Sequence, residues 1–265
     1  MINISVSSSR ITFGSWESYN NGISSKGIKA ENEIQIKSGT YNITSLDDGL
    51  HTNNDASLEN GETPLGNVTI SGGDITISTD DDGIHADNTL NITGGTINVT
   101  TSYEGLEGNT INVSGGETYV YASDDGVNAS TGKVTPSINI TGGYLDVEVP
   151  TSGDTDGIDS NGTLSINGGT VIVKGPGSAG TSAFGAAAVD TDGSVTIKSG
   201  SLIVFGGIEQ TPTSSVTRTL VTSNTVSTGT KTVSFASSGA SYTTTLKSSS
   251  RGLIVYSSLG TATLK

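Results

Sequence analysis

The chain contains no cysteine, one methionine and one tryptophan. Without cysteine it has no disulfide framework, so an exported protein of this kind needs another source of stability, and bound calcium is a common one. Long helix-forming runs are also missing, whereas 37 glycines and many Asn, Thr and Ser residues are present. This composition is typical of an all-β protein with many tight turns.

Basic residues are scarce, with 12 Lys and Arg against 26 Asp and Glu and a formal net charge of −14. Phosphate groups are bound by clustered Lys and Arg, which argues against nucleic acid and anionic membranes as direct partners. Acidic polymers are repelled as well unless cations intervene. No apolar run approaches the length of a membrane span, so we expect no membrane insertion, and the opening residues lack a signal-peptide pattern.

A glycine turn recurs along the chain. The last glycines of its seven copies are Gly39, Gly73, Gly95, Gly116, Gly143, Gly169 and Gly200. The shortest intervals indicate a repeat of about 22 residues, with insertions in the longer copies. Each repeat has a strand before the turn, a strand after it and a third short stretch with Asp-Gly-Ile, all alternating apolar and polar residues at period two.

A repeat of this size with three short strands is typical of one coil of a parallel β-helix, whose coils stack about 4.8 Å apart. A leucine-rich solenoid has a similar period, but its leucine pattern is absent. Two inward ladders are predicted: Ile70, Ile92, Val113, Ile140, Ile166 and Ile197, and Ile77, Val99, Val120, Val147, Val173 and Val204. An outward ladder of amides, Asn91, Asn112 and Asn139, is expected to form hydrogen bonds along the stack.

The glycine turns stop near residue 208, where the chain becomes rich in Ser and Thr. We therefore predict two parts, a β-helix over residues 1–207 and a β-strand segment over 208–265 that caps or flanks the last coils and protects their open edge. The region around Phe13 and Trp16 is expected to cap the other end.

Aligning the repeats on their glycine turns brings acidic residues into two columns. The first column consists of Asp48, Asp82, Glu104, Asp125 and Asp156. The second column consists of His51, His85, Glu107, Asn128 and Asp159, with Asp190 expected next. Carboxylates one coil apart repel by roughly 1 kcal/mol per pair in water and by about 3 to 4 kcal/mol at an effective dielectric constant near 20. All of them cannot be ionised without compensation.

Between Thr40 and Ser160 the one basic residue is Lys133, so the columns require proton uptake or divalent cations. Calcium suits them because it accepts six to eight oxygen ligands in loose geometry, whereas two stacked histidines are weak support for zinc. The competing interpretation is that Asp before Gly is favourable turn chemistry. We expect several calcium ions, held among Asp47, Asp48, Asp80, Asp81, Asp82, Glu104, Glu107, Asp124, Asp125, Asn128, Asp154, Asp156 and Asp159.

Insertions at 53–64, 130–135, 151–155 and 175–184 flank the same acidic corner and are expected to wall a binding surface. The residues expected to contact a bound sugar are Tyr103, His51, His85, Lys133, Tyr119, Tyr121 and Tyr144. Tyr103 lies in the acidic corner itself. For the last three, packing beneath the C-terminal segment is an equal alternative to sugar stacking.

The stretches GIKAENEIQIKSGTYNITSLDDGLH, STDDDGIHADNTLNITGG, SYEGLEGNTINVSGG and ASDDGVNA resemble a family of secreted clostridial carbohydrate-binding proteins, similar in fold to pectate lyases. The resemblance spans about Gly27 to Phe205, and the ending SFASSGASYTTTLKSSSRGLIVYSS is also similar. It implies a right-handed parallel β-helix, calcium at the acidic corner, and binding of cellulose and acidic sugars such as polygalacturonate outside the cell, free or at the cell surface.

Three functions remain open. The first is noncatalytic, calcium-dependent binding of acidic polysaccharide and cellulose by a monomer. The second is a calcium-dependent polysaccharide lyase, which is disfavoured because proton removal needs a Lys or Arg and the corner has almost none. The third is a surface structural protein or adhesin that calcium stabilises.

Overall fold

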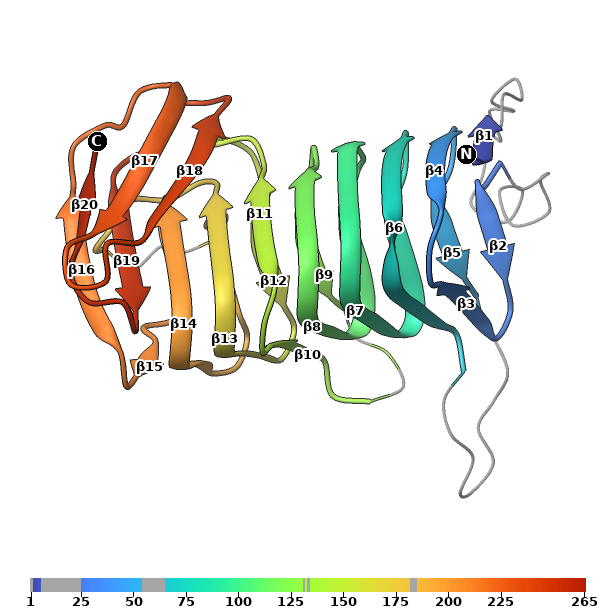
Figure 1. Ribbon diagram of the computed structural model, residues 1–265, viewed down its shortest axis with the longest axis horizontal. Helices are drawn as coiled ribbons and strands as arrows, with labels where there is room; N and C mark the ends of the chain where they lie inside the picture. Colours follow the sequence, from blue (N-terminus) through green and yellow to red (C-terminus); the bar gives the residue numbers. More distant parts are fainter. Residues whose placement is uncertain (1, 6–24, 54–64, 131, 133, 182–184) are drawn as a thin grey trace.

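The structure is a computed structural model that describes residues 2–5, 25–53, 65–130, 132, 134–181 and 185–265. Over these residues the chain is all-β, as predicted, and none of them belongs to a helix that could cross a bilayer. Lys133 and the expected cap around Phe13 and Trp16 lie outside the described residues. Strands of successive repeats stand side by side in chain order along the long axis (Figure 1).

Seventeen strands form one large sheet and three form a second sheet. The large sheet contains β1 (Ile2–Ser5), β2 (Ile28–Ala30), β3 (Glu33–Ile36), β4 (Thr40–Ser45), β5 (Leu50–Thr52), β6 (Asn67–Thr79), β7 (Ile84–Thr101), β8 (Leu106–Tyr121), β9 (Val127–Ala129), β10 (Ser137–Ile140), β11 (Tyr144–Glu148), β12 (Ile158–Ser160), β13 (Thr163–Lys174), β14 (Val195–Phe205), β15 (Thr213–Ser214), β16 (Thr217–Thr222) and β19 (Leu253–Ser257). The small sheet contains β17 (Gly229–Phe235), β18 (Ser241–Leu246) and β20 (Ala262–Leu264).

The large sheet is mixed. Pairings between strands of successive repeats are parallel, as in β6 with β7 and β7 with β8, whereas β19 runs antiparallel to both β14 and β16. The parallel stack therefore ends at β14 and β15, because β19 folds back and pairs antiparallel with β14.

The predicted ladders are present. Parallel pairing places Ile70 beside Ile92 and Ile92 beside Val113, and all three side chains are buried. In the outward amide ladder Asn112 donates to Asn91 at 2.9 Å and Asn139 donates to Asn112 at 3.1 Å. Apolar side chains that stack in register thus form a continuous narrow core, and the polar alternates bond along the outside.

Glycine is required at two kinds of position. All seven predicted turn glycines have positive φ, for example 92° at Gly95, a conformation that L side chains avoid. The glycines of the Asp-Gly stretches have a different reason: a Cβ on Gly83 would lie 2.6 Å from the Gly105 carbonyl oxygen. Successive repeats approach so closely there that no side chain fits.

One detail differs from expectation. The two strands predicted on either side of a glycine turn are continuous in β6, β7, β8, β13 and β14, with register irregularities at the turn. The backbone keeps pairing with the next repeat while it bends, so the glycine forms a corner within one strand.

The C-terminal segment packs on the outward face of the last repeats. Ile172, Phe205, Phe235 and Val255 belong to a second apolar cluster, distinct from the core inside the repeats. In Figure 1 the strands β17, β18 and β20 lie at this end of the molecule.

Candidate functional site: the acidic face

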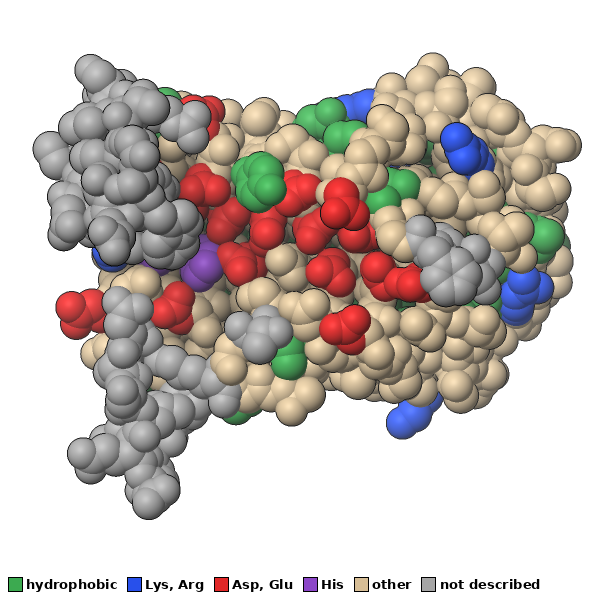
Figure 2. Space-filling view, turned by 180° about the vertical axis from the view of Figure 1, so that it is seen from behind, with side chains coloured by type: hydrophobic (Ala, Val, Ile, Leu, Met, Phe, Trp, Pro, Cys, Tyr) green, Lys and Arg blue, Asp and Glu red, His purple; other side chains and the backbone are tan. Residues whose placement is uncertain are grey.

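The first column forms because the backbone brings each acid next to the following one. Gly49 N–H donates to the carbonyl of Asp82, Gly83 to that of Glu104, and the pattern repeats at Gly105 and Gly126. In the second column His51, His85, Glu107, Asn128 and Asp159 are direct neighbours in the parallel register. Figure 2 shows the acidic side chains gathered on one face of the molecule, here called the acidic face.

Some first-column carboxylates bond to the backbone of the next repeat. Asp48 Oδ1 accepts from the N–H of Asp82 at 3.1 Å, Asp125 Oδ1 from that of Asp156 at 2.8 Å, and Asp156 Oδ1 from that of Ala187 at 2.5 Å. The turn-chemistry interpretation is therefore correct in part, although the bond crosses to the next repeat instead of closing a local turn.

At the N-terminal end the acidic face is neutralised by Lys26. Its Nζ lies 2.7 Å from Asp47 Oδ1 and 2.5 Å from Asp48 Oδ2, and His51 Nδ1 also contacts Asp48 Oδ2. Burial opposes ionisation of Asp48, but the bonds from His51 and Lys26 outweigh it and hold its pKa at about 2. The sequence aligns Lys26 with this corner on the first coil, but spacing alone does not show which carboxylates its ammonium contacts.

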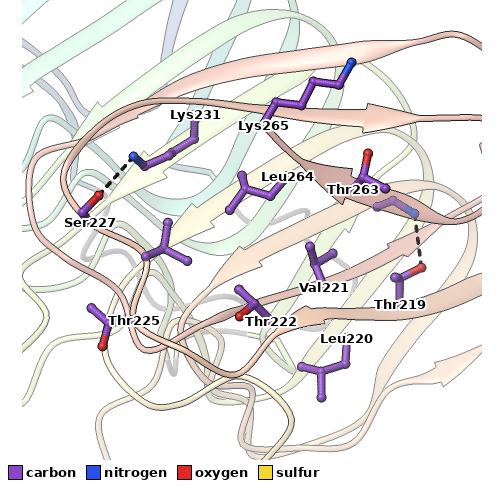
Figure 3. Close-up of a pocket in the computed structure, with 12 residues that line it drawn as sticks. Thr219, Leu220, Val221, Thr222, Thr225, Ser227, Lys231, Thr263, Leu264 and Lys265 are labelled. Atoms are coloured by element: carbon purple, nitrogen blue, oxygen red, sulfur yellow. Dashed lines mark hydrogen bonds between the residues drawn. The ribbon is translucent and has the colours of Figure 1, made fainter.

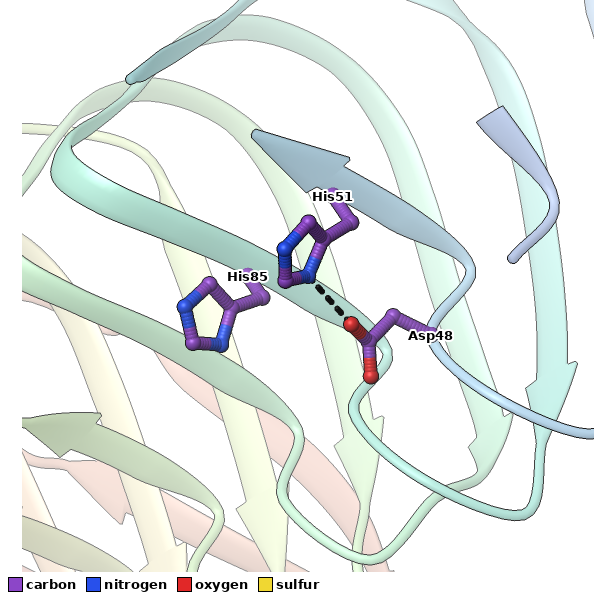
Figure 4. A group of neighbouring side chains, drawn as sticks. All are labelled: Asp48, His51 and His85. Atoms are coloured by element: carbon purple, nitrogen blue, oxygen red, sulfur yellow. Dashed lines mark hydrogen bonds and ion pairs between the residues drawn. The ribbon is translucent and has the colours of Figure 1, made fainter. Parts of the chain in front are cut away.

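His85 neutralises the next repeat. Its ring is stacked on His51 with centroids 4.6 Å apart (Figure 4), and it contacts Asp82, Asp87 and Glu107. Burial disfavours the charged imidazole, yet these three carboxylates raise the pKa of His85 to about 12. In turn His85 lowers the pKa of Glu107 against the effect of burial. Both histidines are thus occupied by carboxylates and face little solvent.

Beyond His85 the carboxylates lose their basic partners among the described residues. Burial, followed by repulsion from Glu107 and Asp82, raises the pKa of Glu104 to about 9. Burial and neighbouring acids likewise raise the pKa of Asp125 to about 7, of Asp156 to about 8 and of Asp159 to about 6. This half of the acidic face therefore needs protons or cations that the described residues do not supply.

Asn128 lies in the middle of that half. Its Nδ2 is 3.1 Å from both Glu104 carboxylate oxygens, and its Oδ1 is buried and has no hydrogen-bond partner among the residues that the structure describes. The Asn128 residue is 9% exposed, so water satisfies this oxygen poorly. An amide oxygen without a donor, surrounded by carboxylates, is the environment that a calcium ion would complete.

Within the described part of the chain, three groups of side chains place potential metal-ligating atoms within 4.8 Å of one another: Asp48, His51 and His85; Asp82, His85 and Glu107; and Asp47, Asp48 and Asp81. Burial and the charges of Asp48 and Asp47 raise the pKa of Asp81. Asp80 and Asp154 are exposed and join none of these groups.

Tyr103 stands over the acidic face and is 48% exposed. Its hydroxyl donates a hydrogen bond to Asp124, which raises the pKa of Tyr103 to about 12. Tyr103 thus lies in the acidic corner, where it contacts Asp124 on the outer edge of the columns.

The second column continues to Asp190, as expected, and one residue further, to Glu209. Bridges of Val189 with Ile158 and with Ile208 place Asp190 next to Asp159, and Glu209 next to Asp190. The pKa of Glu209 is raised, because its protonated carboxyl donates a hydrogen bond to Asp190. The signal for Glu209 is the stretch Gly207-Ile208-Glu209, which repeats the pattern of Gly157-Ile158-Asp159 without a following glycine turn.

The other three tyrosines lie on β8 and β11 beside the C-terminal segment. Tyr144 packs against Tyr242 with ring centroids 6.5 Å apart, and the Lys247 ammonium lies 3.3 Å from the centroid of Tyr121. Tyr119 contacts Tyr144 and is partly exposed. Tyr144 thus packs against the C-terminal segment, whereas the Tyr119 side chain remains partly accessible to solvent.

A cavity of about 670 Å³ lies elsewhere, between β16 and β20 (Figure 3). Its lining is made of Thr and aliphatic side chains with Lys231 and Lys265, and contains no carboxylate side chain. It therefore has no part in the acidic face.

Comparison with curated proteins and with solved structures gives no match. One family of proteins, described as carbohydrate-binding domain-containing, does match, over residues 2–67 and 24–154. These two matches together span residues 2–154, and the second contains most of the two columns. Since that span is more than half of the 265 residues, the chain belongs to the carbohydrate-binding domain-containing family.

Proposed function

We propose that this protein is a noncatalytic module that binds acidic polysaccharide through calcium ions held on the acidic face. The observation that carries the proposal is the half of the columns without basic partners, centred on the unpartnered Oδ1 of Asn128. The ligands proposed for calcium are Glu104, Asp125, Asn128, Asp156 and Asp159. When bound, calcium supplies positive charge and further coordination positions to the carboxylates of a polyuronate.

The donor set fits calcium better than zinc. It consists of carboxylate and amide oxygens, which hard cations prefer, while His51 and His85 already contact carboxylates of their own repeats. One oxygen of Asp125 and one of Asp156 are used by backbone N–H groups, which leaves the second oxygen of each for a cation.

We further propose that the repeats wind as a right-handed parallel β-helix. In-register parallel pairing of β6, β7 and β8 supports this arrangement, since it repeats the acidic columns at the spacing of adjacent strands, about 4.8 Å. Such a rigid surface suits an extended polymer. The proposed location is extracellular, free or at the cell surface, where calcium-binding modules commonly have weak sites.

A lyase is less favoured because it needs a base. Of the basic residues that the structure describes, Lys26 reaches the columns, and it is held by Asp47 and Asp48. A purely structural role for calcium remains the main alternative, since the carboxylates of Asp125 and Asp156 already join successive repeats.

Affinity electrophoresis in gels containing polygalacturonate, with calcium or with chelator, tests the proposal. We expect retardation with calcium that is lost in chelator and is weakened by Asn128→Leu but not by the exposed control Asp80→Asn. Binding that survives complete calcium removal contradicts the bridging mechanism, and absence of binding favours the structural role. Release of unsaturated uronates, detected by ultraviolet absorbance, would instead identify a lyase.

A further inference from the structure

A cleft of about 390 Å³ opens where the outward face of β8 and β11 meets strand β18. Tyr119 and Tyr121 of β8 line one side, and Thr243, Thr244 and Thr245 of β18 line the other. Its volume lies within the range of small-molecule sites, roughly 300–1,000 Å³. It is built by the junction of the repeats with the C-terminal segment.

The cleft exists because the outward side chains change character along the stack. Parallel register places Asn98, Tyr119, Asp146, Ile172 and Ile203 at equivalent positions of successive repeats. Ile172 and Ile203 are buried in the second apolar cluster beneath the C-terminal segment. Asp146 lies at the edge of the surface that the C-terminal segment covers. Tyr119 lies one repeat further, where this surface becomes accessible to solvent.

Buried charges at this margin cancel one another. Lys174 Nζ contacts Asp146 Oδ1 and lies 3.5 Å from Glu148 Oε2, and the three residues are 4% to 6% exposed. Exposed Lys247 adds a second positive charge to the cleft. Two cations and two anions thus give a formal charge of zero, in contrast to the acidic face.

The edge of β18 that lines the cleft is partly occupied already. In the described sheet β18 pairs with β17 alone. On the open side the Thr245 carbonyl accepts from Lys174 Nζ at 3.4 Å, and the N–H groups of Lys247 and Ser248 donate to Glu148 Oε1. A peptide strand cannot pair along an edge whose groups are taken in this way.

We propose that this cleft is a second carbohydrate site, which binds an uncharged sugar segment without metal. Tyr119 offers an aromatic surface to the ring, and the Lys247 ammonium and the exposed Thr245 hydroxyl offer hydrogen bonds to sugar hydroxyls. The hydroxyls of Thr243 and Thr244 already bond within the protein. A cleft of zero net charge neither repels nor concentrates ions, so it selects neutral sugars while the acidic face selects uronates. The inference rests on the carbohydrate-binding function proposed above but not on its calcium ions.

The test is isothermal titration of the full chain with cello-oligosaccharides and xylo-oligosaccharides in chelator. We expect saturable binding that Tyr119→Ala weakens at least tenfold and that Lys247→Met weakens several-fold. Tyr41→Ala, which alters a half-buried tyrosine of β4 outside both proposed sites, is the matched control and should leave this binding unchanged. Thermal melting of each variant shows whether it is folded. If Tyr119→Ala does not fold, Lys247→Met still tests the proposal.

Several results overturn the proposal. The first is that the unaltered chain does not bind neutral oligosaccharides. The second is that the Tyr119 and Lys247 variants bind them as tightly as the unaltered chain. The third is that binding requires calcium. Binding of an extended Thr-Val peptide in place of the sugars would assign the cleft to a polypeptide strand. If polygalacturonate fails to bind while neutral sugars do, the calcium mechanism alone is wrong, so the two proposals fail separately.

Discussion

Asp125 Oδ1 accepts a 2.8 Å hydrogen bond from the backbone N–H of Asp156, the equivalent residue of the next repeat. The same carboxylate is repelled by Asp159, Asp124 and Asp154, and burial raises its pKa to about 7. One side chain thus joins two repeats and at the same time concentrates negative charge. These two roles can be separated by mutation.

Asp125→Asn keeps an oxygen acceptor for Asp156 and removes the charge, whereas Asp125→Ala removes both. In chelator we expect Asp125→Asn to be at least as stable as the unaltered chain, and Asp125→Ala to lose about 1–3 kcal/mol because a buried N–H is left unpaired. In calcium both variants should lose most of the calcium-dependent rise in Tm. An unchanged calcium response in both would remove Asp125 from the ligand set.

Stability in chelator should fall as the pH rises from about 5 to about 9. The folded-state pKa values of Glu104, Asp125 and Asp156 are about 9, 7 and 8, against unfolded values of 4.5 for Glu and 3.8 for Asp. The native state therefore binds more protons over this range, and unfolding becomes easier as they are lost. His85 acts in the same direction, because its pKa of about 12 lies above its unfolded value of 6.5.

Thermal melting at pH 5 and pH 8, with chelator and with calcium, checks this expectation. Calcium should restore stability at pH 8 and have little effect at pH 5, where protons already compensate the carboxylates. A Tm in chelator that rises between these two pH values is the contrary result.

Gly83→Ala should destabilise the fold by about 1–3 kcal/mol or more. The added Cβ would lie 2.6 Å from the Gly105 carbonyl oxygen and 2.7 Å from Val99 Cγ1, and neither the paired backbone nor the core can move away. Gly108→Ala is the control, since its Cβ would approach no atom closer than 3.3 Å. Urea unfolding of the two variants should separate them clearly, and similar midpoints would show that the repeats are less tightly stacked.

Lys26→Met should destabilise the first repeats by about 3 kcal/mol, because Asp48 is buried and loses a direct cation. Lys29 is exposed on β2, three residues after Lys26, so Lys29→Met should change stability by less than about 0.5 kcal/mol. Equal effects in chemical denaturation would mean that general charge, and not the ion pair, matters.

Lys174→Met should loosen the C-terminal segment from the repeats. Removing the ammonium leaves Asp146 and Glu148 buried without their cation, a change that typically costs about 3–5 kcal/mol. Compared with the unaltered chain, we expect amide hydrogen exchange to accelerate more in β17 and β18 than in β7 and β8. Uniform acceleration throughout the chain would instead show that the C-terminal segment and the repeats unfold together.

The ladders and columns could be predicted because they depend on sequence spacing alone. Ile92 and Val113, or His85 and Glu107, occupy the same place in successive repeats, and parallel pairing converts that equivalence into contact. The antiparallel pairing of β19 with β14 was not predictable in the same way, since it joins segments that share no repeat.

The electrostatic state of the site depended on side-chain directions. Lys26 precedes the first acidic stretch, and only the folded backbone shows that its ammonium turns back onto Asp47 and Asp48. The unpartnered oxygen of Asn128 is equally invisible in the sequence, because the same residue type in the outward ladder, Asn112, is fully engaged by its neighbours. Glu209 could have been predicted from the stretch Gly207-Ile208-Glu209, but this stretch lies after the last glycine turn on which the repeats were aligned.

The parallel pairing of equivalent residues in β7 and β8 has a consequence for the evolution of the chain. Each repeat presents to its neighbours much the same surface that they present to it, so a gene that gains or loses one whole repeat still encodes a chain whose new neighbours match. Unequal recombination can thus lengthen or shorten such a protein in single steps. The number of acidic positions offered to a polymer is then an inherited variable that selection can adjust without rebuilding the core.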